Sequence, residues 1–196
     1  MAYVVRGEVY FLVLTGVSVA LHPGYVLKRN EGGMSNYGLH LKTALFYTLA
    51  LALLALYSQR AASLYAHGDQ RSRRLRVLLL SYSAVVFSVL LSTYFYTVNA
   101  TLRDLHFSLG TALIVVVGVG SIWMYTLWPP SLAVRVFLLA QLLGDVLALL
   151  TVVGDLHVLF LTEMLSNIAF FALLVRTCRR VALEGDRSAP SQKSTS

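Results

Sequence analysis

Residues 71–98 read RSRRLRVLLLSYSAVVFSVLLSTYFYTV, an arginine-rich segment followed directly by a long apolar run without a charged side chain. A helix rises about 1.5 Å per residue, so the run over 77–98 is long enough to cross the roughly 30 Å hydrocarbon core of a membrane. Its apolar residues are continuous rather than alternating, which favours a helix over a strand of a membrane barrel. The stretch therefore predicts a transmembrane helix.

The same pattern recurs along the whole chain. The 196 residues are 57% hydrophobic and only 13% charged, which leaves too little polar surface for a water-soluble globule. Six apolar runs have near-spanning length, at residues 9–26, 41–57, 77–98, 107–127, 132–153 and 158–175. Proline or glycine interrupts the chain after the first, fourth and fifth runs. We predict an all-α fold, a polytopic membrane bundle of six transmembrane helices.

The basic residues indicate how this bundle is oriented. If the N-terminus is cytoplasmic, twelve Lys and Arg side chains fall on the inner side, and only Lys28, Arg29, Lys42 and Arg103 fall outside. This positive-inside bias predicts that both termini are cytoplasmic and that the protein is a multi-pass protein of the cell membrane. The net charge of +7 is then explained by topology and by contact with anionic lipids, so we expect no nucleic-acid partner.

The domain organisation is simple. We predict one transmembrane domain over residues 1–183, with an outer loop at about 22–40 and a basic inner loop at about 58–76. Residues 184–196 are rich in Ser, Pro and charge without periodicity, which is typical of a disordered tail. The first run also has the length of a signal-peptide core, but only Arg6 precedes it, offset by Glu8, so we expect this helix to be retained.

Polar side chains enter the predicted bundle from its outer face. In the fifth run Gln141 and Asp145 lie one helical turn apart, and in the sixth Glu163 and Asn167 repeat that spacing. Both acids would lie roughly 10 Å below the outer helix ends, without an obvious cationic partner. A carboxylate at such depth faces a water-filled cavity, binds a cation or a polar headgroup, or is protonated and hydrogen-bonded to a neighbouring helix.

The third run adds a polar stripe that we expect to turn inward. Its members follow helical spacing and are Ser81, Ser88, Ser92, Tyr96 and Asn99. We therefore predict an outward-facing polar cavity for a lipid or another ligand, lined by Ser92, Tyr96, Gln141, Asp145, Glu163 and Asn167. Small residues are expected to permit close helix approach, at Gly110, Gly118 and Gly144.

The outer loop combines paired glycines with hydrogen-bonding side chains. Its distinctive members are Glu31, Gly32, Gly33, Ser35, Asn36 and Tyr37. Glycine permits close approach of a ligand to the backbone, and the neighbouring side chains supply polar groups. Two interpretations stay open, a headgroup-binding loop and a tight turn into the second helix.

Histidines also gather on the predicted outer side. They are His22, His40, His106 and His157, and Asp155 lies close to the last of them in the sequence. Neutral imidazoles and carboxylates suit zinc and similar divalent ions, so a metal site is one hypothesis. The alternative is that these residues meet lipid headgroups, because no pair has the spacing of a known metal motif. We predict no other cofactor.

The outer loop carries His22-Pro23-Gly24 and the segment EGGMSNYG at 31–38. In this loop and in its six-helix architecture the chain resembles a broad group of small membrane proteins, prokaryotic six-pass proteins with a domain of unknown function and the eukaryotic FRAG/DRAM/SFK family. The resemblance implies roles in membrane-lipid organisation, in lipid-anchor remodelling or in regulation of partner proteins. It carries no catalytic set, and this chain lacks an extensive outer domain. A comparison with the seven-pass hydrolases related to ceramidases is weaker, because their paired-histidine spacing is absent.

Three hypotheses for function follow. In the first, the protein is not an enzyme and handles membrane lipids or regulates a partner, which is another membrane protein or further copies of the same chain in a homo-oligomer. In the second, it is a metal-dependent hydrolase or transferase that acts on lipid headgroups. In the third, it is a subunit of an ion- or proton-coupled transporter in which Asp145 and Glu163 bind the cation.

Overall fold

The structure is a computed structural model that describes residues 1–26, 33–66, 68–127, 131–153 and 158–188. Within these residues the chain is helical, with turns and without strands. The elements are α1 (Ala2–Leu21), η1 (Pro23–Tyr25), η2 (Gly33–Ser35), α2 (Asn36–Leu39), α3 (Ala44–Ser63), α4 (Gln70–Thr93), α5 (Ala100–Thr126), α6 (Leu132–Val153) and α7 (Leu159–Ser188). Six of them, α1 and α3 to α7, are long and apolar enough to cross a membrane, which confirms the predicted six-helix bundle.

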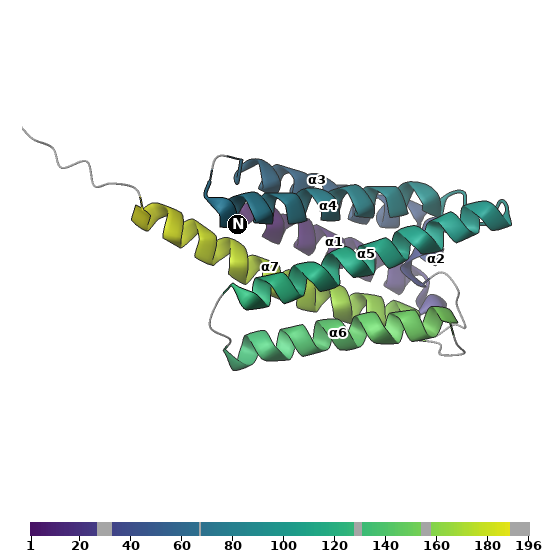
Figure 1. The fold of residues 1–196 in the computed structure, drawn as a ribbon. Coiled ribbons are helices and arrows are strands. Elements are labelled where there is room, and N and C mark those ends of the chain that lie inside the picture. The colour runs from purple at the N-terminus through teal and green to yellow at the C-terminus, as the bar shows by residue number, and fades with distance from the viewer. Residues whose placement is uncertain (27–32, 67, 128–130, 154–157, 189–196) are drawn as a thin grey trace, which may run out of the picture.

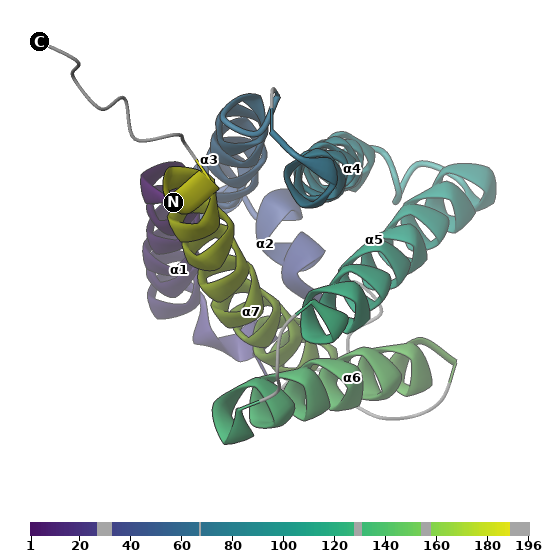
Figure 2. The same ribbon diagram turned by 60° about the vertical axis from the view of Figure 1, so that its left-hand side comes forward.

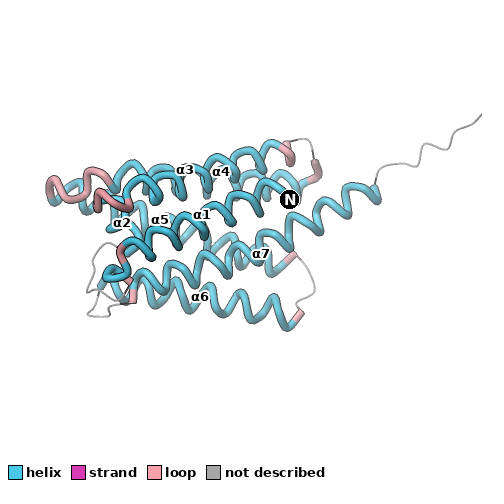
Figure 3. Tube along the Cα trace, turned by 180° about the vertical axis from the view of Figure 1, so that it is seen from behind, coloured by secondary structure: helices cyan, strands magenta, loops and turns pink. Residues whose placement is uncertain are grey.

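The long helices run up and down and form a closed arrangement in which α1 packs on α3, α3 on α4, α4 on α5, and α6 on α7 (Figures 1 and 2). Because the number of crossings is even, α1 begins at the same end of the bundle at which α7 finishes (Figure 1). We call this the terminal end. Figure 3 shows α2 at the opposite end, which we call the loop end.

Large apolar side chains cover the outside of the bundle. Val13, Leu45, Val119 and Leu139 are each exposed over more than half of their surface. In water such a surface would be unfavourable by roughly 25 cal/mol for each Å² of apolar area, whereas hydrocarbon solvates it well. The inside of the bundle is by contrast partly polar, with buried side chains that include Glu8, His106, Gln141 and Asp145.

The third apolar run does not form one continuous helix to its end. The α4 helix stops at Thr93, turns occupy residues 94–98, and Asn99 caps α5 by accepting a hydrogen bond from the Leu102 amide at 2.9 Å. The prediction of one inward stripe from Ser81 to Asn99 was therefore wrong, because the capping residue is exposed and belongs to the next helix. The buried face of α4 instead carries Tyr82 and Thr93.

Two predicted loop boundaries also differ from the structure. The connection between α3 and α4 is confined to residues 64–69, so of the arginines of the predicted basic loop, Arg60 lies in the last turn of α3 and the others lie in the first turns of α4. At the other end of the chain α7 continues to Ser188, so residues 184–188 of the predicted tail are helical. Arg71 Nη1 lies 2.7 Å from Glu184 Oε2 and joins the start of α4 to the end of α7. Residues 189–196 lie outside the described part of the chain.

Glycines permit close packing at some positions but not at all of the predicted ones. A Cβ at Gly144 would lie 3.0 Å from the Ser166 amide nitrogen, so α6 and α7 approach each other closely there, as predicted. A Cβ at Gly118 would meet only the Asp145 carboxylate, and one at Gly110 would have no neighbour within 4 Å. Gly110 therefore does not serve helix packing; it faces empty space, and that space is the cavity described next.

Candidate functional site

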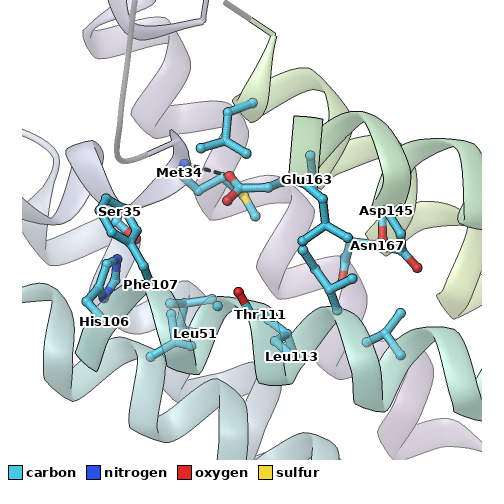
Figure 4. A pocket seen from close by; sticks show the side chains of 18 of the residues that line it. Met34, Ser35, Leu51, His106, Phe107, Thr111, Leu113, Asp145, Glu163 and Asn167 are labelled. Carbon is cyan, nitrogen blue, oxygen red and sulfur yellow. Dashed lines mark hydrogen bonds between the residues drawn. The ribbon is translucent and has the colours of Figure 1, made fainter. Parts of the chain in front are cut away.

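A cavity of about 130 Å³ lies inside the bundle toward its loop end. Its walls come from α3, α4, α5, α6 and α7, and η2 lies over it (Figure 4). Most lining side chains are apolar. The lining residues are Met34, Ser35, Tyr47, Leu51, Tyr82, Val89, His106, Phe107, Gly110, Thr111, Leu113, Ile114, Val117, Asp145, Ala148, Leu149, Leu159, Glu163, Ser166 and Asn167.

The cavity reaches the outer surface of the bundle between α5 and α6. Thr111 on α5 and Leu149 on α6 both line the cavity, and both are exposed. Phe107 and Ile114 extend the same wall of α5 and are partly buried. Because these residues belong to helices that are long and apolar enough to span a membrane, the opening faces the region that lipid tails would occupy.

The outer loop is tied to the cavity by Glu163. The Met34 amide donates a hydrogen bond of 2.7 Å to Glu163 Oε2, drawn as a dashed line in Figure 4. Gly33 makes this bond geometrically feasible, because its φ is +51° and a Cβ there would collide with the Glu163 carboxylate. The acid on α7 and the loop segment are 129 residues apart in sequence, so the contact is a long-range closure of the loop onto the bundle.

Further hydrogen bonds hold the same loop segment over the cavity. Thr43 Oγ1 donates to the Tyr37 carbonyl at 2.7 Å, and Tyr96 OH donates to Asn36 Oδ1 at 3.2 Å. The Tyr37 ring is 1% exposed and packs on Phe160 of α7. We call the described segment Gly33–Leu39 the cap. Of the outer-loop residues singled out in the sequence, Gly33, Ser35, Asn36 and Tyr37 belong to it, whereas Glu31 and Gly32 lie outside the described residues.

Asp145 is the second carboxylate on the cavity wall, and it is held by its own network. Gln141 Nε2 donates to both of its oxygens, at 2.9 and 3.0 Å, and Ser166 Oγ donates to Oδ1 at 2.7 Å. The predicted one-turn spacing on α6 therefore produces a direct contact between Gln141 and Asp145. Gln141 is fully buried behind Asp145 and does not line the cavity.

A third buried carboxylate was missed in the sequence. Glu8 of α1 is 2% exposed and accepts a hydrogen bond of 2.8 Å from Asn167 Nδ2. Tyr82 OH in turn donates to Asn167 Oδ1 at 2.9 Å. The missed signal was helical spacing, because Glu8 falls on one buried stripe of α1 with Val4, Phe11, Thr15 and Ser18.

Ser92 and Tyr96, which the sequence analysis expected at the cavity wall, lie instead behind His106. The His106 ring lines the cavity, its Nδ1 lies 2.7 Å from Ser92 Oγ, and it stacks on Tyr96 with ring centroids 4.6 Å apart. Asp145, Glu163 and Asn167 line the cavity directly. The structure thus brings all six predicted residues to one region, three as lining and three as support.

The residues of the metal hypothesis are only partly brought together. The rings of His22 and His40 lie 4.4 Å apart at the loop end, and two neutral imidazoles could supply two metal ligands. His106 is engaged with Ser92 and Tyr96. His157 and Asp155 lie outside the described residues, and within the described ones there is no group of three His, Cys, Asp or Glu side chains that could hold a metal. The metal site stays a prediction.

The three acids of the interior share one electrostatic feature. Among the described residues, no Lys, Arg or His lies within ion-pair distance of Glu8, Asp145 or Glu163. Their hydrogen-bond partners are neutral amides and hydroxyls. In a medium of low dielectric a carboxylate interacts strongly with any cation or strong donor that reaches it, so the cavity wall is suited to such a group.

No family model, curated protein or solved structure matches the chain. The function is therefore inferred from the geometry of the site.

Proposed function

We propose that the protein is a lipid-binding protein of the cell membrane that holds part of one lipid molecule in the cavity between α5, α6 and α7. The observation that carries the proposal is a mainly apolar cavity that opens between two spanning helices and ends against carboxylates under the cap. An apolar wall suits a hydrocarbon chain, and a few converging polar groups at one end suit a headgroup. Holding a lipid in this way requires no chemical reaction, so the proposed role is to bind the lipid, or to regulate a partner protein through lipid binding.

The size of the cavity limits what it can hold. An apolar cavity of about 150 Å³ in another protein binds benzene, and the space here is about 130 Å³. It can therefore accommodate a short chain segment or a small headgroup, but not a whole phospholipid. The rest of the lipid would remain in the bilayer and pass through the opening beside Thr111 and Leu149.

The proposed orientation places both termini in the cytoplasm and the cap outside. Twelve of the sixteen Lys and Arg residues then lie on the inner side, namely Arg6, Arg60, Arg71, Arg73, Arg74, Arg76, Arg135, Arg176, Arg179, Arg180, Arg187 and Lys193. In membrane proteins the cytoplasmic loops carry more Lys and Arg than the outer loops do. The cavity would accordingly open to the outer leaflet.

The proposal is tested by filling the cavity. A Cβ at Gly110 meets no atom within 4 Å, and Gly110 lines the cavity, so Gly110→Leu should occupy the space without a clash. Gly16→Leu on α1 is a matched control, because Gly16 is exposed and its Cβ also has no neighbour within 4 Å. Lipids that remain after purification and delipidation are quantified by mass spectrometry.

The expected result is that Gly110→Leu loses the retained lipid, whereas wild type and Gly16→Leu keep about one molecule per chain. Equal lipid retention by both variants would contradict the proposal. Equal thermal unfolding of the two variants would show that the loss reflects an occupied cavity rather than damage to the bundle.

A further inference from the structure

Most of the hydrogen-bond donors around the cavity are already used by the protein. Tyr82 OH donates to Asn167, and Asn167 Nδ2 donates to Glu8. Ser166 Oγ donates to Asp145, and the Met34 amide donates to Glu163. The Tyr82 and Ser166 hydroxyls and the Met34 amide have no further hydrogen to offer a ligand without first breaking an internal bond, whereas the Asn167 amide keeps one N–H hydrogen.

The hydroxyls of Ser35, Tyr47 and Thr93 form a chain with a fixed direction. Thr93 Oγ1 donates to the Val89 carbonyl at 2.8 Å, so it must accept in its 3.1 Å contact with Tyr47 OH. Tyr47 therefore donates to Thr93, and in its 3.4 Å contact with Ser35 its oxygen accepts. The hydroxyl hydrogens of this chain are thus also engaged.

The tautomer of His106 follows from the same reasoning. Ser92 Oγ donates to the Val89 carbonyl at 2.9 Å and also lies 2.7 Å from His106 Nδ1. A hydroxyl has one hydrogen, so both bonds form together only if His106 Nδ1 is the donor. In the neutral ring Nε2 then carries a lone pair and is an acceptor.

The acids on the cavity wall, by contrast, can still accept hydrogen bonds from a ligand. Each carboxylate oxygen can accept about two hydrogen bonds, and among the described residues Glu163 accepts one, from Met34. Asp145 lines the cavity on the next helix, and no described cation pairs with either acid. A phosphate or carboxylate headgroup would find no Lys or Arg among the lining residues, and as donors only neutral groups such as the Thr111 hydroxyl and the second Asn167 N–H.

From this inventory we propose that the lipid bound in the cavity carries a protonated amine, which donates to Glu163 at the inner side of the cap. The inference rests on the proposed function and adds the ligand class to it. An ammonium group offers three donors and a positive charge, and it is compact enough for the roughly 130 Å³ space. A hydroxyl offers one neutral donor, and charged hydrogen bonds are about twice as strong as neutral ones.

The test uses the full chain in phosphatidylcholine nanodiscs and a dodecylamine that carries a photoreactive diazirine on a carbon close to the amine, so that the reactive group enters the cavity with the head group. After irradiation, labelled peptides are mapped by mass spectrometry. Labelling is competed with unlabelled dodecylamine, dodecanol or dodecanoate, which share one chain length and differ only in the head group. The variants are Gly110→Leu and Gly16→Leu for the cavity, and Glu163→Gln for the proposed amine contact.

We expect dodecylamine to reduce labelling of α5 at about one tenth of the dodecanol concentration, as a charged hydrogen bond in place of a neutral one predicts, and dodecanoate to be the weakest competitor. Glu163→Gln should bring amine and alcohol to within about three-fold of each other. Glu184→Gln, an acid-to-amide change at the exposed end of α7, should keep the wild-type order. Gly110→Leu should abolish the cavity labelling, and Gly16→Leu should not.

Each outcome bears on a separate step. Equal competition by the three head groups in wild type, with labelling still blocked by Gly110→Leu, would overturn the amine assignment and leave the lipid-binding proposal standing. A wild-type amine preference that persists in Glu163→Gln would overturn the role of Glu163. Labelling that Gly110→Leu does not reduce would overturn both proposals. The wild-type competition needs no variant, so it remains decisive if a substitution impairs folding.

Discussion

The hydrogen bond between the cap and Glu163 can be tested by placing a single methyl group at Gly33. In Gly33→Ala the new Cβ would occupy the position of the Glu163 carboxylate, so the side chain of Glu163 must swing away. Its 2.7 Å bond from the Met34 amide is then lost. The backbone is strained as well, because the φ of +51° at Gly33 lies in the left-handed region that favours glycine.

The size of the effect follows from these two contributions. A left-handed conformation costs an alanine roughly 1 kcal/mol relative to glycine. Loss of a hydrogen bond to a charged acceptor costs about 2 kcal/mol more. Together they should weaken docking of the cap by about 3 kcal/mol, which corresponds to about a hundred-fold larger population of the undocked loop.

Hydrogen–deuterium exchange of the Met34 amide measures that population, since exchange of a protected amide tracks its local opening. We expect exchange to accelerate about a hundred-fold in Gly33→Ala. Gly24→Ala is the matched control in the same connection, because its methyl would make only an ordinary contact of 3.6 Å with the His22 ring. If exchange in Gly33→Ala stayed within about three-fold of wild type, the cap would not be held by Glu163.

Three further predictions concern stability, measured by thermal unfolding in detergent. Glu8→Leu should destabilise the protein by about 1–2 kcal/mol because it leaves the partly buried Asn167 amide without its acceptor, whereas Glu8→Gln keeps an acceptor and should cost less than half as much. Gly144→Ala should cost about 1–3 kcal/mol, because its Cβ would press on the α7 backbone at 3.0–3.1 Å; an unchanged midpoint would refute that close approach. The Ser72 amide donates to Asp69, the α4 N-cap, and lowers the pKa of that carboxyl. The contribution of this hydrogen bond to stability should be complete above the ordinary pKa of about 4 and fade as the pH falls through the lowered value. Asp69→Ala should cost about 1 kcal/mol at neutral pH. Asp69→Asn keeps a capping residue, so it should remove only the pH dependence.

The number and approximate position of the helices could be predicted because spanning length is a property of contiguous sequence. Within a single helix the one-turn spacing of Gln141 and Asp145 could be read from the sequence, and in the structure this spacing brings the two side chains into contact. The end of α4 could not be read in the same way, since apolar and aromatic residues continue through the turn at 94–98. There the capping geometry of Asn99 determines the boundary, and hydropathy carries no information about it.

Contacts between helices were beyond the reach of sequence spacing. Glu163 and Asn167 are one turn apart on α7, yet Glu163 binds the cap and Asn167 binds Glu8 of α1. Each pairing depends on which helices are neighbours, and periodicity along one helix does not specify that. Glu8 was read only as a charge before the first run; its helical spacing could have indicated a buried position, but its pairing with Asn167 depends on the placement of α1 against α7.

The position of these pairings on α7 decides which experiments can separate binding from folding. Glu163, Ser166 and Asn167 lie at positions i, i+3 and i+4, so one stripe of α7 reaches the cap, α6 and α1. Truncating any of the three would remove a wall of the cavity and a hydrogen bond between elements at once, so a loss of lipid binding would have two causes. Gly110 makes no side-chain contact and still faces the cavity. A side chain added there breaks no hydrogen bond between elements and reduces the space available to a ligand, so a loss of lipid from Gly110→Leu has a single cause when its thermal unfolding matches that of Gly16→Leu.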